Sequence, residues 1–462
     1  MARGQPNPLL AALLGEAGWS AAELAKAVNA LGAAQGLPLR YDRTSVAHWL
    51  AGSRPRPPVP TLVASAFSRR SGRLVTAEET GLARHGPAGD AEPIPSSHRS
   101  GRDDVLDQLA VLCRADIDPA RRGTLAGSAY SLVAAAATDW QRDRPADPVP
   151  PRPPAAVPRA TDADLQRMRW VILIAADLLE RHGGGHARTA VAAYAADDTG
   201  GLLTAPAAPS LQRELFTGAG QLTHLLGRMS MDAGHQRLAQ RYFGVSLGLA
   251  READDRRLYA ITLRAMSLQA LHLGFLKNAG ELADAAVNTA GPRADPSTRA
   301  FLLSQRGLTH AQARHHREAV RDLTAAETQH DRSTSPAGPF THYPRPGLDY
   351  QRGRALLALG DPVQAVRALA TAAEARPEDS NRSSALTRAR LAETLLSLGR
   401  LEESCVHWHV FLDHYPSLRS SAADQALRNL RRSLRAFRDR PQAAALLARA
   451  RPLTPRPRQH TF

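Results

Sequence analysis

The sequence predicts an all-α protein in which a small N-terminal helical bundle is joined to a C-terminal α-solenoid of repeated helix pairs. Apolar residues make up 43% of the 462 residues, whereas aromatic residues make up only 5%. The apolar residues are mostly alanine and leucine, which suits helix-on-helix packing better than sheets. Helix start and stop signals are grouped in the first 80 residues, and small residues recur at regular spacing in the second half of the chain.

The first two predicted helices begin at clear capping signals. Asn7 and Pro8 have the form of a helix start, and an apolar stripe follows at Leu9, Leu10, Leu13 and Leu14. Ser20 and Glu23 have the spacing of a capping box, so a second helix is expected over Ala21–Leu31. Trp19 and Leu24 have the spacing of a hydrophobic staple at its start. A further helix, roughly Thr61–Arg73, would close the bundle.

Residues Arg43–Pro57 predict a short helix followed by a basic exit loop. Val46, Trp49 and Leu50 fall at i, i+3 and i+4 and would bury one face. Asp42 is placed to cap the start, and Gly52 to close the end in a left-handed conformation. This segment is therefore expected to be a well-bounded helix with one polar face.

The polar face of that helix has the side chains that a DNA major groove accommodates. Its residues are small or form hydrogen bonds, and arginines follow in a proline-stiffened turn. The pattern resembles the lambda-repressor-like class of helix-turn-helix domains. We expect Arg43, Thr44, Ser45 and His48 to face double-stranded DNA, with Thr44 and His48 reading bases. Arg54 and Arg56 are the expected phosphate contacts.

One part of the N-terminal bundle departs from that class, and one alternative stays open. The approach over Gly32–Tyr41 is longer than the usual tight turn before the recognition helix. The alternative is that residues 1–80 form only a small docking bundle, because Val46 and Trp49 would be buried in either case.

The predicted domain organisation follows composition. Residues 1–85 form the helix-turn-helix domain, and 86–102, rich in proline, glycine and serine, form a linker. Residues 103–160 form a helical segment with a proline-rich loop over Asp143–Arg159. Residues 161–453 form the repeat domain, and 454–462 form a basic tail.

The repeat domain follows the tetratricopeptide pattern of paired helices. The clearest unit has small residues and a final proline at Gly353, Gly360, Ala365, Leu369, Ala372 and Pro377. Turn positions 234, 274, 314, 360 and 399 lie 40, 40, 46 and 39 residues apart, longer than the standard unit of about 34 residues. The longest step absorbs the loop Asp331–Gly347. A degenerate pair, Leu165–Leu179 with His186–Ala196, opens the array, and Ala422–Ala450 closes it, giving six or seven pairs.

Stacked helix pairs form a superhelix with a concave wall, which suits binding of a partner. We expect this wall to bind a peptide, small-molecule or protein effector, to mediate homodimerisation, or both. The alternative is that the array serves only as a scaffold or dimerisation body.

The order of modules resembles the helix-turn-helix plus tetratricopeptide regulators of actinomycetes, which control differentiation and antibiotic production. The resemblance is carried by Arg43–Pro57, by Asp118–Tyr130 with its Pro-Ala-Arg-Arg-Gly core, and by Asp232–Ala250. In plan, the repeat part is also similar to peptide-sensing regulators of other Gram-positive bacteria. These resemblances imply a DNA-binding transcriptional regulator. The alternative is a protein-interaction scaffold that does not bind DNA and sequesters another regulator.

Charge and cysteine content set the remaining expectations. The net charge is +15, but the 59 basic residues include only Lys26 and Lys277 as lysines, so the arginine excess is partly compositional. Cys113 and Cys405 are far apart and form no paired motif, which fits a reducing cytoplasm. The longest apolar runs are too short for a membrane span. We therefore expect a cytoplasmic protein that does not bind membranes.

The residue pattern does not indicate a catalytic or a metal-binding site. Cys405 and His409 share a helix face, but no third ligand stands at standard spacing, and His315 and His316 fall in an inter-helix turn. The Gly183–Gly185 run lacks the Lys-Ser/Thr pair of a phosphate loop and is expected to be a permissive turn. We expect neither an enzyme nor a cofactor or metal site.

Overall fold

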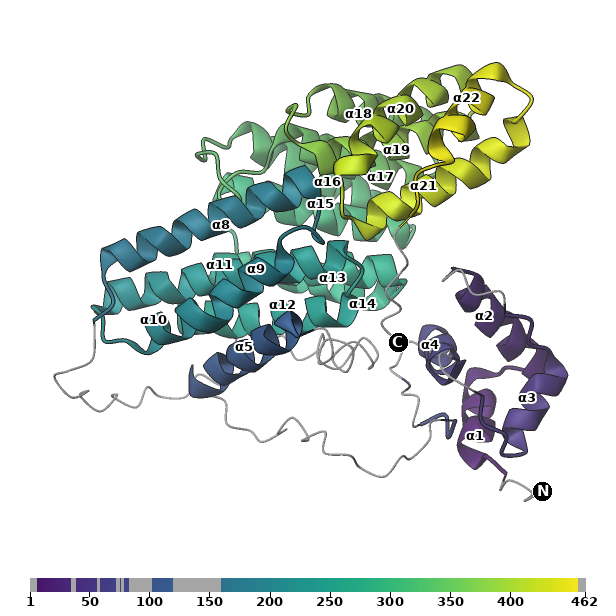
Figure 1. Cartoon of the computed structure of the whole chain (residues 1–462), viewed down its shortest axis with the longest axis horizontal. Coiled ribbons are helices and arrows are strands. Elements are labelled where there is room, and N and C mark those ends of the chain that lie inside the picture. Colours follow the sequence, from purple (N-terminus) through teal and green to yellow (C-terminus); the bar gives the residue numbers. More distant parts are fainter. Residues whose placement is uncertain are drawn as a thin grey trace. The chain divides into compact units, whose positions relative to one another are not determined.

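The computed structural model describes residues 6–34, 39–55, 59–71, 75, 79–82, 102–118 and 159–455. All regular secondary structure in these ranges is helical, as the composition predicts. The chain forms two compact units, one built mainly on residues 1–99 and the other on residues 100–126 and 138–461. Figure 1 shows α1 to α4 of the first unit in purple, and the helices of the second unit from blue to yellow.

Several segments expected from the sequence fall on residues that the structure does not describe. The linker over 86–102, the proline-rich loop over Asp143–Arg159 and the basic tail over 454–462 lie almost entirely outside the described residues. The same holds for most of Asp118–Tyr130.

Side-chain caps fix the starts of the helices in the N-terminal unit. The Asn7 Oδ1 atom accepts a hydrogen bond from the Leu10 backbone N–H at 3.1 Å, at the start of α1. Glu23 accepts from the Ser20 backbone N–H at 2.7 Å, and the Ser20 hydroxyl accepts from the Glu23 N–H at 3.3 Å. Both start signals read from the sequence are confirmed. The four helices are α1 (Pro8–Ala17), α2 (Ala21–Ala34), α3 (Arg43–Leu50) and α4 (Val59–Ser71).

These helices share one apolar core. Its buried members include Leu10, Leu24, Val28, Val46, Trp49, Leu62, Val63 and Phe67. Of the apolar stripe on α1, Leu10, Leu13 and Leu14 are buried, whereas Leu9 is 51% exposed. Trp19 packs against Phe67, with ring centroids 5.7 Å apart, and so ties the start of α2 to α4.

The second unit begins with α5 (Arg102–Ile117), which a buried ion pair fastens to the repeat helices. Arg188 at the start of α9 (Arg188–Tyr194) pairs with Asp116, and both side chains are at least 95% buried. The Tyr242 hydroxyl donates a hydrogen bond to the other Asp116 oxygen at 2.9 Å. Cys113 lies in the same core, where burial raises the pKa of its thiol to about 12. Helix α5 is thus an integral layer of this unit.

Six helix pairs follow α9 and α10 (Gly200–Thr204) along the chain. Their bounds are α11 (Pro209–Asp232) and α12 (Gln236–Glu252), α13 (Arg256–Leu273) and α14 (Leu276–Ala290), α15 (Pro296–Gln312) and α16 (His316–Asp331), α17 (Arg345–Leu359) and α18 (Pro362–Glu374), α19 (Asn381–Ser397) and α20 (Leu401–His414), and α21 (Ser421–Leu434) and α22 (Pro441–Ala450). Each pair packs on the next, which gives the tetratricopeptide-like solenoid that the repeat pattern predicts.

The predicted turn positions share one backbone conformation. Gly234, Gly274, Gly360 and Gly399 have φ angles between 77° and 93°. Arg314, the fifth turn position, has φ 63° although it carries a side chain. This left-handed conformation lets the chain reverse between the helices of a pair, and glycine adopts it at little energetic cost.

Small residues allow the two helices of each pair to cross closely. A Cβ atom on Gly227 would lie 2.5 Å from the Phe243 ring, and one on Gly353 would lie 2.7 Å from Leu369 Cγ. Neither distance leaves room for a methyl group. The motif glycines are therefore explained by the helix crossing.

The opening of the array differs from the predicted pair. Helix α8 (Asp162–His182) forms as one long helix and packs against α11. The helix expected over His186–Ala196 is instead short: α9 ends at Tyr194, and a π-helical turn, Ala195–Thr199, leads into α10. Where a regular second helix is expected, the backbone hydrogen bonds of this turn therefore span five residues in place of four.

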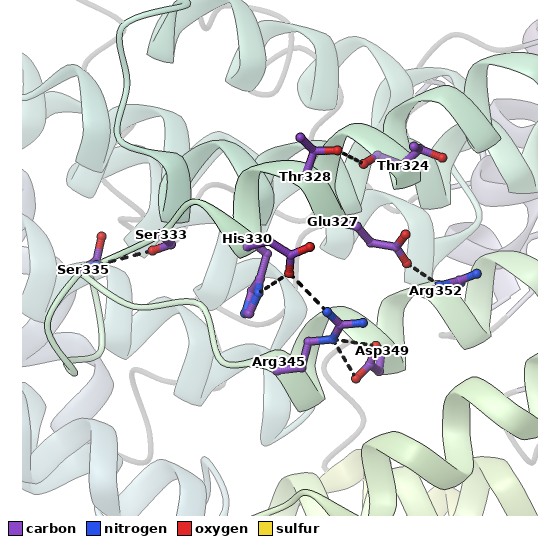
Figure 2. Close-up of polar contacts among 10 residues, drawn as sticks. Thr324, Glu327, Thr328, His330, Ser333, Ser335, Arg345, Asp349 and Arg352 are labelled. Carbon is purple, nitrogen blue, oxygen red and sulfur yellow. Dashed lines mark hydrogen bonds and ion pairs between the residues drawn. The ribbon is translucent and has the colours of Figure 1, made fainter.

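The longest step of the array is held by ion pairs between α16 and α17 (Figure 2). Between these helices, Arg345 contacts Asp331 at 3.4 Å and Arg352 pairs with Glu327, and within α17 Arg345 also contacts Asp349 at 3.1 Å. Residues 332–344 form the loop between the two helices, as the 46-residue spacing predicts.

The first helix of the array returns to contact the fifth pair of the solenoid and the segment that leads into the sixth. Helix α8 packs against α19, and the Arg419 backbone N–H donates to the His182 carbonyl at 2.6 Å. Asp232, whose side chain is 1% exposed, accepts hydrogen bonds from the Gly184 N–H at 2.8 Å, from Arg382 at 2.7 to 2.8 Å and from the Ser420 hydroxyl at 2.9 Å. We call this set of contacts the closure. It joins segments about 200 residues apart in the chain.

Within the described ranges, no helix combines the length and apolar character needed to cross a bilayer.

Candidate functional site

Helix α3 is bounded as the sequence predicts. The Asp42 carboxylate accepts from the Ser45 N–H at 2.8 Å, and the Ser45 hydroxyl accepts from the Asp42 N–H at 3.4 Å. These hydrogen bonds from Ser45 lower the pKa of Asp42, so the cap stays ionised at neutral pH. At the other end Gly52 has φ 98°, and the Ser53 N–H bonds to the His48 carbonyl at 2.9 Å. The ionised Asp42 cap and the left-handed conformation of Gly52 thus define the two ends of this eight-residue helix.

The apolar face of α3 is anchored to its neighbours. Val46 is fully buried and Trp49 is 3% exposed. The Tyr41 ring meets Trp49 edge-on, with centroids 5.0 Å apart. The Leu50 carbonyl accepts from the Asn7 N–H at 2.8 Å, which ties the end of α3 to the start of α1. The orientation of α3 within the N-terminal unit is therefore determined by buried contacts.

The approach to α3 is fastened by a side chain of α2. Asn29 donates from Nδ2 to the Tyr41 carbonyl at 2.7 Å and accepts from the Tyr41 N–H at 2.8 Å. Helix α2 also runs on to Ala34, and Gly32 packs against Leu39, where a Cβ would lie 2.5 Å from Leu39 Cδ1. The long approach is thus partly helix and ends at an anchored residue. Positions 35–38 lie outside the described residues.

The outer face of α3 carries most of the predicted DNA contacts. Arg43, Thr44 and His48 are exposed, and Arg54 is exposed just after the helix. Within the described part of the chain, none of the three basic side chains forms an ion pair with a carboxylate. Ser45 differs, because it is half-buried and its hydroxyl also donates to Asp42 at 2.8 Å. Arg56 lies outside the described residues.

This arrangement offers hydrogen-bond donors and acceptors on a narrow helix with a positive charge at each end. Thr44 and His48 stand one turn apart, the spacing at which two side chains reach adjacent base edges. Arg43 and Arg54 flank them, where a duplex would present its phosphates.

The repeat unit contains a second group of functional side chains, which sequence reasoning misses. We call it the basic cluster: Arg228 on α11, Arg264 and His272 on α13, Arg354 on α17 and Arg390 on α19. Burial lowers the pKa of Arg264 to about 10, with further lowering from Arg228 and Arg354. Four separate repeat helices therefore bring positive charges within electrostatic range of one another.

The pKa of His272 reflects its burial and the charges of the basic cluster. Burial, followed by the charges of Arg354, Arg390, Arg382 and Arg264, lowers its pKa to about 3. Its ring nevertheless has an exposed surface. His272 is therefore in contact with solvent and within electrostatic range of the arginines of the cluster.

A chain of hydrogen bonds across three helices holds Arg354 in place. Its guanidinium donates to Gln351 Oε1 at 3.0 Å, Gln351 donates to Gln305 at 3.0 Å, and Gln305 donates to Ser267 at 3.3 Å. The same guanidinium lies 3.4 Å from His272 Nε2. The only sequence signal for this arrangement is the presence of arginines on the first helices of the pairs, in a chain that is rich in arginine everywhere.

Structural roles account for Cys405, His407, His409 and the Gly183–Gly185 run, for which the sequence predicts neither a metal site nor a phosphate loop. The Cys405 side chain is buried, and burial raises its pKa. His407 contacts Arg388 at 3.1 Å, and His409 contacts Arg449 at 3.3 Å, so the two rings point to different partners. Gly183–Gly185 is a turn, as predicted, and a Cβ on Gly184 would lie 2.1 Å from the Met229 carbonyl oxygen. These glycines are required by the closure.

Comparison with known proteins finds one similarity in the N-terminal unit and one that spans most of the chain. Residues 10–83 match the family model described as the SP15 N-terminal domain. No curated protein matches the chain. Among solved structures, the crystal structure of the APC/C hetero-tetramer Cut9–Hcn1 is similar over 84% of this chain, with 16% identity and a TM-score of 0.34. The match spans 63% of that solved chain, which is under two thirds of its length.

Proposed function

We propose that the protein is a DNA-binding transcriptional regulator in which α3 reads the major groove and the repeat unit binds an effector or a second copy of the chain. The observation that carries the proposal is the outer face of α3, where Thr44 and His48 are exposed between Arg43 and Arg54. A helix whose cap, core face and approach are all fixed can present these side chains in one geometry. The resemblance to actinomycete regulators with the same order of modules adds to this.

The test measures binding of the full chain to DNA by mobility shift and fluorescence anisotropy. Genomic fragments are first selected for binding, and the selected sites are compared with random duplexes. Thr44→Ala with His48→Ala is expected to remove the preference for selected sites and to leave binding to random duplexes unchanged. Arg54→Ala is expected to weaken binding to both and to reduce the slope of log K against log salt by about one. Arg317→Ala, an exposed substitution on α16, is the control.

The proposal fails if the genomic selection recovers no DNA bound in a salt-dependent manner while circular dichroism shows a folded protein. It also fails if the control weakens binding as much as Arg54→Ala.

A second candidate function, a scaffold that sequesters another regulator, is favoured by one surface. Trp170, Leu173 and Ile174 form an apolar stripe on α8, with exposed fractions of 66%, 49% and 53%. Such stripes are typical of interfaces with partners. Sedimentation of the wild-type chain and of Trp170→Ser separates the two uses of this stripe: a dimer that the substitution dissociates indicates self-association, and an unchanged monomer favours a different protein.

A further inference from the structure

We infer that the basic cluster of the repeat unit is a binding site for a small ligand that carries two or more phosphate groups. The role of this ligand as an effector rests on the proposed function, whereas its binding to the basic cluster does not require DNA recognition. The inference depends on three observations: unpaired guanidinium groups, their fixed positions and the closure of the array around them.

The first observation is an uncompensated positive charge. Arg390 pairs with Glu393 at 3.1 Å, but within the described residues Arg228, Arg264 and Arg354 have no carboxylate at ion-pair distance. Arg264 Nε is buried and makes no hydrogen bond. Charged groups removed from bulk water are costly unless they are paired, and these three also repel one another. A bound anion would supply the missing partner.

The wider surroundings do not neutralise this charge. Arg382 acts on Arg228 and His272, which brings the number of arginines to five. The carboxylates that act on them are Glu180, Asp232 and Glu393. Two of these are already engaged in other bonds, since Asp232 binds Arg382 and Glu180 accepts from the Ser383 N–H at 3.0 Å. The five arginines exceed the three carboxylates by two positive charges, which matches a ligand with two or more negative charges.

The second observation is that the guanidinium groups are held in position before any ligand arrives. Arg354 is fixed by the hydrogen-bond chain through Gln351, Gln305 and Ser267. Arg264 stacks on the Phe301 ring, with its Cζ atom 3.8 Å from the ring centroid. A stacked guanidinium presents its N–H groups edge-on, which is the geometry that binds phosphate oxygens in pairs.

The third observation limits the size of the ligand. The closure joins α8 to α19 and the Gly183–Gly185 turn to Arg419, so the helices that carry the cluster belong to an array whose two ends are tied together. An extended peptide needs a groove that is open at its ends. A compact anion does not, and exposure of the His272 ring shows that solvent reaches the cluster.

The test is a thermal-shift and calorimetric titration of the full chain without DNA, at constant ionic strength. The probes are inorganic phosphate, pyrophosphate, adenosine 5′-diphosphate and an acidic hexapeptide. We expect saturable binding of pyrophosphate or the nucleotide, weaker binding of phosphate, and none of the peptide. Arg264→Gln and Arg354→Gln are expected to weaken binding by about ten-fold or more, because each removes a charge-assisted hydrogen bond.

The matched control is Arg352→Gln, two residues from Arg354 on the same helix. Arg352 is exposed and pairs with Glu327 away from the cluster (Figure 2). This variant should bind the probes as wild type does. Without ligand, Arg264→Gln should melt no lower than wild type, because the substitution removes repulsion, and this separates loss of binding from loss of folding.

The inference is overturned if no phosphate probe binds at millimolar concentration, if all three variants bind equally, or if only the peptide binds. Because DNA is absent, these outcomes do not depend on recognition by α3, and failure of the DNA experiments leaves them unaffected.

Discussion

Asn29 holds the backbone of Tyr41 through two hydrogen bonds, one from its amide nitrogen and one to its amide oxygen, of 2.7 Å and 2.8 Å. Through this pair α2 sets the point at which the chain enters α3, and the Tyr41 ring then rests on Trp49. The long approach to the recognition helix therefore ends in a fixed geometry.

Asn29→Ala is expected to weaken DNA binding without changing its salt dependence. The substitution removes both hydrogen bonds and lowers the free energy of unfolding of the N-terminal unit by about 1 to 3 kcal/mol. All phosphate contacts remain, so the slope of log K against log salt stays that of wild type. Anisotropy titrations at several salt concentrations measure both quantities. A slope reduced as in Arg54→Ala would contradict an orienting role for Asn29.

Arg314→Gly is expected to stabilise the repeat unit. Arg314 has φ 63°, a left-handed conformation that costs a residue with a side chain about 1 to 2 kcal/mol. Glycine avoids this cost, but its greater conformational freedom in the unfolded chain offsets about 0.5 to 1 kcal/mol of the gain in stability. A gain of up to about 1 kcal/mol should appear in urea unfolding. Arg314→Ala keeps the strain and serves as the control, so an equal gain in both variants would show that the side chain, and not the backbone, is responsible.

Arg188→Ala is expected to destabilise the protein strongly. It leaves the fully buried Asp116 carboxylate without its cation, which costs about 3 to 5 kcal/mol. Arg181→Ala, which removes two exposed ion pairs, with Asp177 and with Asp379, should cost about 1 kcal/mol or less. Thermal unfolding of the full chain compares the two. The double substitution Asp116→Leu with Arg188→Met should recover part of the loss, and a double variant worse than the single one would argue against an ionic origin.

Acidification is expected to destabilise the repeat unit through His224. Burial, and then the charges of Arg228 and Arg264, hold the pKa of His224 well below its usual range, and its Nδ1 atom lies 3.1 Å from the Thr262 hydroxyl. In the unfolded chain the ring gains a proton as the pH falls through about 6.5, whereas in the folded protein it stays neutral. Stability therefore holds above about pH 6.5 and declines below it, by up to about 1.4 kcal/mol per pH unit.

His224→Gln should make that decline less steep between pH 6.5 and 5, with the contribution of His272 remaining, and the exposed substitution His316→Gln should leave it unchanged. Urea unfolding at a series of pH values provides the measurement. An identical slope in wild type and His224→Gln would show that other groups cause the loss.

The helices and turns could be predicted because their signals are local. The caps at Asn7, Ser20 and Asp42 each act over three residues. Each turn glycine is required by the left-handed backbone conformation at its own position. The positions 234, 274, 314, 360 and 399 could therefore be read directly from spacing.

The contacts that the sequence did not reveal are long-range. Asn29 and Tyr41 are 12 residues apart, Asp116 and Tyr242 are 126 apart, and Asp232 and Ser420 are 188 apart. No periodicity marks such pairs, because they depend on how helices pack. The basic cluster is hidden for a further reason, since its arginines stand among many exposed ones.

The closure at Asp232 changes how this solenoid is expected to unfold. In an open array each repeat contacts only its neighbours, so terminal repeats fray first and stability adds up along the row. Here the opening helix is bonded to the fifth pair and to the segment that leads into the sixth, so neither part can detach without disrupting the other. The consequence is a single cooperative melting transition for the array and slow refolding, because a contact between distant segments must form before either end is secure.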